Sequence, residues 1–368
     1  MKILHIVDNI AINSGVSTSI INLYQNINQN RIQFDFLVGC KKEYSYEQEI
    51  KHMKGEVYYV GLQNISLLNM PYFIYNVRNF FKNNSYKYNI AHLHSIVFCF
   101  PYLYFAKKNN IKNRIAHCHA SKLSSNPVNE FRNKLLVYPL SRLATNFVSC
   151  SNLASKNVFL PLGIDNYDIF VNGIDCKKYS MNLYIRNKMR NEFNIRHDDI
   201  VIGHISNMTP LKNVEFVINV FNSIKSKCKN SKLILIGKEK LPENIINAIR
   251  CNNLSDSVFL LGVRFDIANL LQMMDVCLLP SRAEGLGITA VECQAANVPV
   301  ITSYGFPEDI YLTDIIHRLN LDVDLWAELS IKIAKLRTVS CNKERLTKKF
   351  DISNTSKFIM DYYNRLPR

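Results

Sequence analysis

Short apolar runs alternate with segments of helical periodicity through the first half of the chain. The apolar runs lie at residues 2–7 (KILHIV), 34–40 (FDFLVGC), 89–95 (NIAHLHS), 113–121 (NRIAHCHAS) and 146–151 (NFVSCS). Between them lie helical patterns such as those at residues 17–27 (STSIINLYQNI) and 70–84 (MPYFIYNVRNFFKNN). Strands that alternate with helices are typical of parallel βαβ units. The pattern therefore predicts an α/β fold with a doubly wound sheet.

The same alternation begins again in the second half of the chain. Strand patterns lie at residues 199–206 (DIVIGHIS), 232–237 (KLILIG), 257–262 (SVFLLG), 276–281 (VCLLPS) and 298–303 (VPVITS). Two successive series predict two doubly wound domains, which divide near residues 166–172. The last segment, FDISNTSKFIMDYYNRL, predicts an amphipathic helix whose apolar stripe contains Ile359, Tyr362, Tyr363 and Leu366.

The composition is that of a folded protein in a reducing compartment. The chain has 368 residues, of which 48% are hydrophobic, and this is enough for two domains with buried cores. Its ten cysteines are scattered without C-x-x-C spacing, so we expect neither a disulfide framework nor a zinc framework. No signal-peptide pattern and no apolar span of ~18 residues is present. We expect a cytoplasmic protein, either soluble or peripheral on the inner face of the cell membrane.

Basic residues are concentrated in one part of the chain. The formal net charge is +15. The segment from Pro101 to Thr145 contains one acidic residue, Glu130. It contains these basic residues: Lys107, Lys108, Lys112, Arg114, Lys122, Arg132, Lys134 and Arg142. Such a segment favours an anionic partner, which could be a lipid surface, a phosphorylated substrate or a nucleic acid. A basic surface without any specific partner is the alternative.

The segment AEGLG joins a predicted strand to a predicted helix. In open α/β sheets ligands bind at the carboxyl ends of strands, where this turn lies. Gly285 and Gly287 permit close backbone approach, and the free amides of a helix start bind phosphate. Glu284 and Glu292 lie on either side and can accept hydrogen bonds from sugar or ribose hydroxyls. The alternative is that Glu284 caps the helix and Glu292 is an ordinary exposed residue.

The string PSRAEGLGITAVECQAANVPVITS resembles the signature of the retaining glycosyltransferases of family four, the group 1 type, which have the GT-B fold. Further segments resemble that family in the same order along the chain: MKILHIVDNIAINSGVSTSIINLY, HCHAS, FVNGID, IGHISNMTPLKN, FLLGVRFDIANLLQMMDVCLLPS and the terminal helix. Many matches in order are more specific than one motif. The resemblance implies two facing Rossmann-like domains, with an acceptor-binding domain at residues 1–170 completed by residues 352–368, and a nucleotide-sugar-binding domain at residues 171–351.

The resemblance also implies roles for individual residues of the second domain. Lys212 matches the lysine that neutralises the leaving diphosphate, so no metal or other cofactor is expected. Glu284 matches the carboxylate beside the transferred sugar, and Glu292 matches the one that binds the ribose. The turn amides come from Gly285, Leu286 and Gly287.

Two positions depart from the family pattern. Asn207 stands in the donor site where an arginine normally accompanies the lysine, and Arg264 and Arg282 are candidate replacements. In the loop NSGVS, Ser14 stands where the family usually has a first glycine, which leaves Gly15 to contact the diphosphate or the acceptor. A turn that required a positive φ at Ser14 would be strained.

His119 in HCHAS matches the family histidine near the sugar and the reacting centre. We expect it to donate a hydrogen bond to a sugar hydroxyl or to stabilise developing charge. His92, His94 and His117 lie in or at the ends of predicted strands, where core packing explains them. Glu308 in GFPED follows the next strand, in a region where family members have a polar residue of the cleft, but it is not a predicted site residue.

The resemblance implies retaining transfer of a sugar from a nucleoside-diphosphate sugar, with uridine as the expected base. The expected acceptor is a glycan or a polyprenyl-diphosphate-linked glycan in the synthesis of capsule or exopolysaccharide. A catalytically degenerate GT-B subunit that binds without turnover is the alternative. A nicotinamide-dependent dehydrogenase would need G-x-G-x-x-G after the first strand, which NIAINSGVS does not provide. We expect no nucleic-acid partner, because the basic charge is the only feature that favours one and the sequence shows no recognition helix or aromatic platform.

Overall fold

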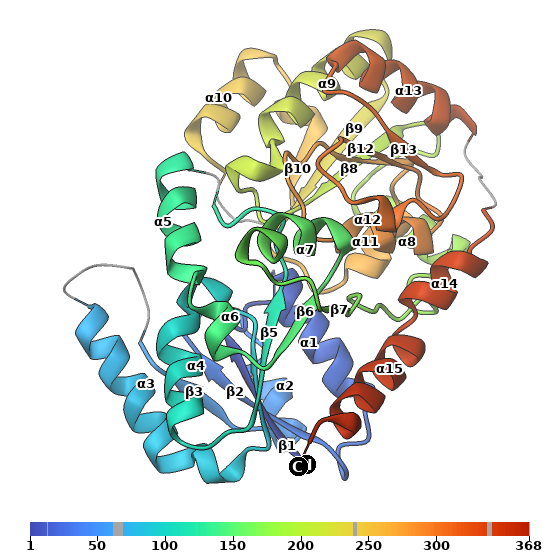
Figure 1. Ribbon diagram of the computed structural model, residues 1–368. Helices are drawn as coiled ribbons and strands as arrows, with labels where there is room; N and C mark the ends of the chain where they lie inside the picture. The colour runs from blue at the N-terminus through green and yellow to red at the C-terminus, as the bar shows by residue number, and fades with distance from the viewer. Residues whose placement is uncertain (13, 62–68, 125, 238–240, 337–340, 368) are drawn as a thin grey trace. The chain divides into compact units, whose positions relative to one another are not determined.

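The computed structural model describes residues 1–12, 14–61, 69–124, 126–237, 241–336 and 341–367 (Figure 1). The chain forms two compact units. Unit 1 consists of Met1–Gly173 together with Ile352–Arg368, and unit 2 consists of Ile174–Asp351. Each unit has its own parallel sheet and its own hydrophobic core.

The sheet of unit 1 has the strand order β3-β2-β1-β4-β5-β6-β7, and neighbouring strands are parallel. Its strands are β1 (Lys2–Val7), β2 (Gln33–Val38), β3 (Val57–Tyr59), β4 (Ile90–Leu93), β5 (Asn113–Cys118), β6 (Asn146–Ser149) and β7 (Asp168–Ile169). The apolar runs predicted as strands in this half all overlap strands of the sheet. They are mainly apolar rather than alternating because a parallel sheet with helices on its faces is buried on both sides.

Helices surround this sheet in unit 1. They are α1 (Gly15–Gln25), α2 (Glu47–His52), α3 (Met70–Asn84), α4 (Cys99–Lys108), α5 (Pro127–Val137), α6 (Leu140–Leu143), α7 (Asn152–Val158) and α15 (Ile352–Arg365), with short 3₁₀ turns η1 (Ser85–Lys87), η2 (Ile96–Phe98) and η3 (Leu160–Leu162). The predicted bounds of α3 are confirmed. The predicted apolar stripe of α15 is also confirmed, since Ile359, Tyr362 and Tyr363 are buried in the core of this unit.

The sheet of unit 2 has the strand order β10-β9-β8-β11-β12-β13, again parallel. Its strands are β8 (Ile200–Ile205), β9 (Ser231–Ile236), β10 (Val258–Leu260), β11 (Val276–Leu279), β12 (Val300–Thr302) and β13 (Ile316–Arg318). The helices are α8 (Leu183–Glu192), α9 (Val214–Lys227), α10 (Glu243–Cys251), α11 (Ile267–Gln272), α12 (Ile288–Ala295), α13 (Val323–Leu336) and α14 (Glu344–Phe350), with η4 (Pro210–Lys212), η5 (Ser255–Ser257) and η6 (Glu308–Ile310).

Helix α8 was not predicted, because its segment reads as polar. Arg186 and Arg190 on this helix both form ion pairs with Asp275, which precedes β11. Asp275 also accepts a hydrogen bond of 2.7 Å from the Val201 amide in β8. A polar anchor therefore holds α8 in place, and hydrophobic periodicity does not detect such an anchor.

The two sheets share one topological feature that places functional sites. In each, the chain order reverses between two neighbouring strands, β1 and β4 in unit 1 and β8 and β11 in unit 2. Ligands of open α/β sheets bind outside the carboxyl ends of the strands at such a point. Within the described part of the chain, none of the helices combines the length and apolar character needed to cross a lipid bilayer.

Candidate active site

Three loops of unit 2 are joined at the carboxyl edge of its sheet. The loop after β8 contains η4, and the loop after β11 carries Glu284. The Arg282 amide donates a hydrogen bond of 2.8 Å to the Leu211 carbonyl, and the Glu284 amide donates one of 2.9 Å to the Gly305 carbonyl after β12. Backbone contacts therefore hold Lys212 and Glu284 in a defined arrangement.

Lys212 and Glu284 form an ion pair. Lys212 Nζ donates a hydrogen bond of 2.6 Å to Glu284 Oε1, and the two side chains are 23% and 11% exposed. The residues are far apart in sequence, and their strands β8 and β11 are neighbours in the sheet. The pair places one cation and one hydroxyl acceptor at the reversal point of the sheet. A diphosphate and a sugar require these two groups.

Gly287 determines how α12 begins. Its backbone φ is +81°, in the left-handed region, and a Cβ atom there would lie 2.3 Å from Cε1 of Phe306. Another residue would therefore be strained in its backbone and would also collide with the ring. The turn, with buried Leu286 and partly exposed Gly285, presents the first amides of α12 at the same edge as Glu284.

Glu292 is buried in the middle of α12. It is 9% exposed, and the Tyr179 hydroxyl donates a hydrogen bond of 2.7 Å to its Oε1. Burial raises the pKa of Glu292 to about 7, and the hydrogen bond from Tyr179 offsets part of that rise. The alternative of an ordinary exposed residue is therefore wrong. A capping role for Glu284 is also wrong, since Gly287 occupies the N-cap position and no side chain of the described residues caps α12.

Asn207 does not supply a replacement for the expected arginine. Its side chain is exposed, and its Oδ1 accepts a hydrogen bond of 3.1 Å from the Thr209 hydroxyl, which shapes the turn after β8. Arg264 is paired with Asp266 at 2.7 Å, and Arg282 is exposed. Glu308 forms an ion pair with Arg318 and is 81% exposed.

In unit 1 the corresponding edge carries His119, directly after β5. His119 Nε2 lies 2.8 Å from His94 Nδ1, and His94 Nε2 lies 2.9 Å from His5 Nδ1. Burial lowers the pKa of His119 to about 3, so the ring is neutral at pH 7. A neutral ring donates from one nitrogen and accepts at the other, which suits a hydrogen bond to a sugar hydroxyl and not cationic catalysis.

His92 and His117 are buried in β4 and β5, as core packing predicts. They are also hydrogen-bonded, with 3.2 Å between His92 Nε2 and His117 Nδ1 and 2.7 Å between His92 Nδ1 and the Tyr363 hydroxyl. The prediction that His94 only packs is incomplete, because His94 contacts His119 directly.

The loop after β1 has no strain at the position where a family glycine is missing. Ser14 has φ of −99° and is the N-cap of α1, where its hydroxyl accepts a hydrogen bond of 3.4 Å from the Ser17 amide. Gly15 is the first residue of the helix. The serine therefore takes the ordinary role of a helix cap.

Sequence reasoning missed Tyr179, His204 and Phe306. Tyr179 lies in a polar stretch without periodicity, and nothing in the sequence links it to Glu292. His204 in β8 is buried, and it contacts the Leu278 carbonyl at 2.7 Å and the Ser206 hydroxyl at 2.8 Å. The hydroxyl of Ser206 in turn accepts from the Met208 amide, so His204 supports the loop that leads to Lys212.

Known proteins resemble this chain over most of its length. Residues 185–349 match the family model of the glycosyl transferases group 1. EpsF of Bacillus subtilis (strain 168), a protein named as a glycosyltransferase, is 27% identical over 355 residues, which cover 90% of this chain and 88% of EpsF. The O-antigen biosynthesis glycosyltransferase WclY of Escherichia coli is 32% identical over 177 residues, 47% of this chain and 44% of WclY.

A solved structure shows the same fold. The crystal structure of Anabaena Alr3699/HepE in complex with UDP-glucose superimposes with a TM-score of 0.81 over 100% of both chains, at 16% identity. Together with the two parallel sheets, these matches establish the fold. Residues 185–349 are similar to the group 1 glycosyltransferases, and the chain has the α/β GT-B fold and is a transferase of the hexosyltransferase type.

Proposed function

We propose that the protein transfers a sugar, with retention of configuration, from a uridine-diphosphate sugar to a glycan or lipid-linked glycan of a cell-surface polysaccharide. The observation that carries this proposal is the Lys212–Glu284 pair beside the start of α12, with Glu292 in the same helix. The UDP-glucose complex of HepE supports the donor class, and the O-antigen name of WclY supports the polymer class, which includes capsule and exopolysaccharide.

Lys212 is the proposed diphosphate cation. In the structure its ammonium group binds Glu284, so the donor would draw Lys212 towards the diphosphate and free the Glu284 carboxylate for sugar hydroxyls. Glu292 is proposed to accept from the ribose. The amides of Gly285, Leu286 and Gly287 are proposed to bind the diphosphate, with Asn207 and Gly15 as further donor contacts. Because lysine supplies the charge, the transfer step is proposed to need no metal.

His119 is the proposed contact of unit 1 to the transferred sugar. Its neutral ring would donate or accept one hydrogen bond with a sugar hydroxyl. Retention without a carboxylate nucleophile is proposed to proceed by front-face departure, in which the leaving diphosphate accepts the proton of the acceptor. NMR of the product tests this step, because an inverted anomeric configuration would contradict it.

Two assays separate this proposal from a degenerate subunit. The degenerate subunit is favoured by two observations. Asn207 stands in place of an arginine, and Arg264 is already paired with Asp266. A thermal-shift screen of nucleotide sugars should identify the donor, because a ligand at 100 times its dissociation constant adds about 2.7 kcal/mol of stability. Donor hydrolysis should then follow with the same nucleotide sugar. Binding without hydrolysis or transfer would favour the degenerate subunit.

Helix α5 supports a peripheral position at the inner face of the cell membrane. Val128, Phe131 and Leu135 lie at helical spacing and are 76%, 67% and 62% exposed. Lys134 on the same helix is exposed as well, and exposed Lys122 precedes it. Exposed apolar side chains beside lysines are typical of helices that lie in the interface of an anionic membrane. A polyprenyl-diphosphate acceptor would be reached at such a surface.

Vesicle flotation tests the membrane proposal. The protein should float with anionic vesicles at low salt and dissociate at high salt. The double variant Phe131→Ser/Leu135→Ser should bind about tenfold less, whereas Phe265→Ser, at a 61% exposed phenylalanine of unit 2, should bind normally. Absence of flotation at low salt, or equal loss in the control, would remove the membrane from the proposal.

A further inference from the structure

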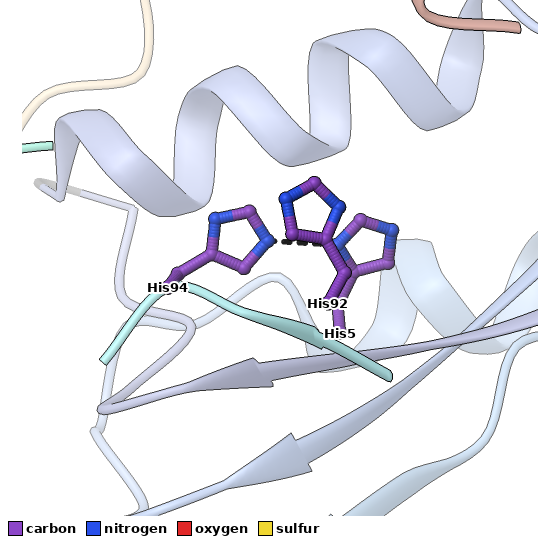
Figure 2. A group of neighbouring side chains, drawn as sticks. All are labelled: His5, His92 and His94. Atoms are coloured by element: carbon purple, nitrogen blue, oxygen red, sulfur yellow. Dashed lines mark hydrogen bonds between the residues drawn. The ribbon is translucent and has the colours of Figure 1, made fainter. Parts of the chain in front are cut away.

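Five histidines meet at the carboxyl edge of three neighbouring strands of unit 1. His5 lies in β1, His92 in β4 and His117 in β5, and His94 and His119 directly follow the last two strands. His5 and His92 are register partners across β1 and β4. Figure 2 shows His5, His92 and His94 with their rings turned towards one another above these strands. Helix α1 contributes Ser19, Ile20 and Leu23 to the same small cavity that the five rings line.

Hydrogen bonds among the described residues do not satisfy this cluster. His5 Nε2, His117 Nε2 and His119 Nδ1 are buried without a partner in the described part of the chain. His204 of unit 2 shows the contrast, because both of its ring nitrogens contact a protein oxygen. Buried polar atoms are nearly always paired, so five adjoining histidine rings with three unpaired nitrogens are unusual for a packed core.

The distances suit a metal ion. One ring nitrogen each from His5, His92 and His94 lies within 4.8 Å of the other two. Two nitrogens bound tetrahedrally to zinc at about 2.0–2.1 Å are about 3.3 Å apart. His5 Nδ1 and His94 Nε2 are 2.9 Å apart, so a small outward movement would admit an ion between them. The cavity has a volume of about 20 Å³, which is room for one water-sized occupant.

We propose that His5, His92 and His94 bind one divalent transition-metal ion of the zinc class. The proposed ligand atoms are His5 Nδ1, His94 Nε2 and His92 Nε2, and an ion on His92 Nε2 would replace its contact of 3.2 Å with His117 Nδ1. Neutral imidazole is the common ligand of such ions, and a site with three histidines leaves a fourth position for water or a further ligand.

The remaining ring nitrogens of two ligands already have the partners that a metal site requires. His92 Nδ1 lies 2.7 Å from the Tyr363 hydroxyl, and His94 Nδ1 lies 2.8 Å from His119 Nε2. Metal-bound histidines usually donate their other N–H to such a group. The second possible group, His94, His117 and His119, would instead use His119 as a ligand. The first group is also the more buried, since His5 and His92 are 1% and 2% exposed.

Metal binding would fix the hydrogen bonding of His119. A metal on His94 Nε2 leaves the proton on His94 Nδ1, which then donates to His119 Nε2. His119 in turn keeps its proton on Nδ1. The effect of this fixed hydrogen bonding on sugar transfer rests on the proposed function of His119. The metal site itself does not rest on it.

Zinc binding to the full chain, prepared without a histidine tag and stripped with EDTA, tests the site. Titration calorimetry should give one tight zinc site per chain, and cobalt should give the visible absorption of a tetrahedral complex. His5→Gln and His92→Gln should each weaken zinc binding at least 100-fold. His52→Gln, at an exposed histidine of α2, should not change it. Tight binding that survives both ligand substitutions, or no tight site in the wild type, would overturn the proposal.

X-ray absorption at the zinc edge gives a measurement that does not depend on the folding of variants. The zinc-loaded wild type should show three imidazole nitrogens at about 2.0–2.1 Å. Fewer than three imidazoles, or sulfur ligands, would refute the site. Because neither measurement uses donor or acceptor, a failure of the metal site and a failure of sugar transfer remain distinguishable. Donor binding in the thermal-shift screen is scored separately.

Discussion

The substitution Gly287→Ala tests how tightly the turn before α12 is constrained. Alanine at this position meets two obstacles. The backbone φ of +81° disfavours any residue with a Cβ atom, by about 1–2 kcal/mol. The new Cβ would also lie 2.3 Å from Cε1 and 2.5 Å from Cδ1 of Phe306, and forcing an extra carbon into a packed site typically costs about 1–3 kcal/mol. The free energy of unfolding should therefore fall by about 2–5 kcal/mol.

Gly163→Ala is the matched control for the backbone effect. Gly163 has a φ of +70°, and apart from its two chain neighbours no atom of the described residues lies within 4 Å of the position that its Cβ would take. This variant should lose only the backbone term, about 1–2 kcal/mol, part of which the stiffer unfolded chain offsets. The difference between the two variants measures the collision with Phe306. Combining Gly287→Ala with Phe306→Ala should recover part of that collision energy, even though Phe306→Ala alone is destabilising.

Urea unfolding followed by circular dichroism measures the stability of each variant. Calorimetry with the nucleotide sugar from the thermal-shift screen measures donor affinity. Gly287→Ala should also weaken donor binding, because the amides that begin α12 move with the turn. If Gly287→Ala and Gly163→Ala prove equally destabilising, and the Phe306→Ala background makes no difference, the close contact with the ring does not govern this turn.

Three further substitutions test the charges of unit 2. Lys212→Met should lower turnover about 10²–10³-fold, because the transition state loses one cation. Lys332→Met, at an exposed lysine of α13, should leave turnover unchanged. Equal kinetics for the two variants would contradict the role of Lys212. Burial raises the pKa of Glu292 from 4.5 to about 7, so the folded protein holds a proton that the unfolded chain releases between these values. The free energy of unfolding of the wild type should therefore fall as pH rises through this range. Between pH 5 and pH 7.5, the loss measured by urea unfolding should be about 2–3 kcal/mol smaller for Glu292→Gln than for the wild type. Parallel pH profiles for the two proteins would refute this. Asp275→Ala should lower the free energy of unfolding by about 3–5 kcal/mol, since it leaves Arg186 and Arg190 without their shared carboxylate, and a loss below 1 kcal/mol by calorimetry would show that this anchor is unimportant.

The order of strands and helices was largely predictable from local patterns. The run at residues 2–7 became β1, and the amphipathic pattern at residues 70–84 became α3 with the same bounds. Both features depend on periodicity within a single segment, which the sequence displays directly. Helix α8 escaped prediction because its stability comes from Asp275, which lies more than 80 residues away in the chain.

The candidate site was only partly predictable for the same reason. Residue types and spacing, together with the family resemblance, singled out Lys212, Glu284, Glu292 and His119, and the catalytic roles of these residues stay predictions. The contact of Lys212 with Glu284 joins segments 72 residues apart, and the hydrogen bond of Tyr179 to Glu292 joins segments 113 residues apart. The burial that raises the pKa of Glu292 likewise depends on the folded chain. No local pattern reports such contacts.

Local patterns in the chain are enough to predict the alternation of strands and helices, the glycine turn before α12 and the chemical types of the residues at the strand ends. Which of these residues meet depends on how the strands are ordered in the folded sheets. The order β1-β4-β5 brings together histidines from three separate strands, and the neighbouring positions of β8 and β11 bring Lys212 to Glu284. The physical reason is that parallel strands require long crossover connections, so residues that become neighbours at the carboxyl edge are always distant in the chain.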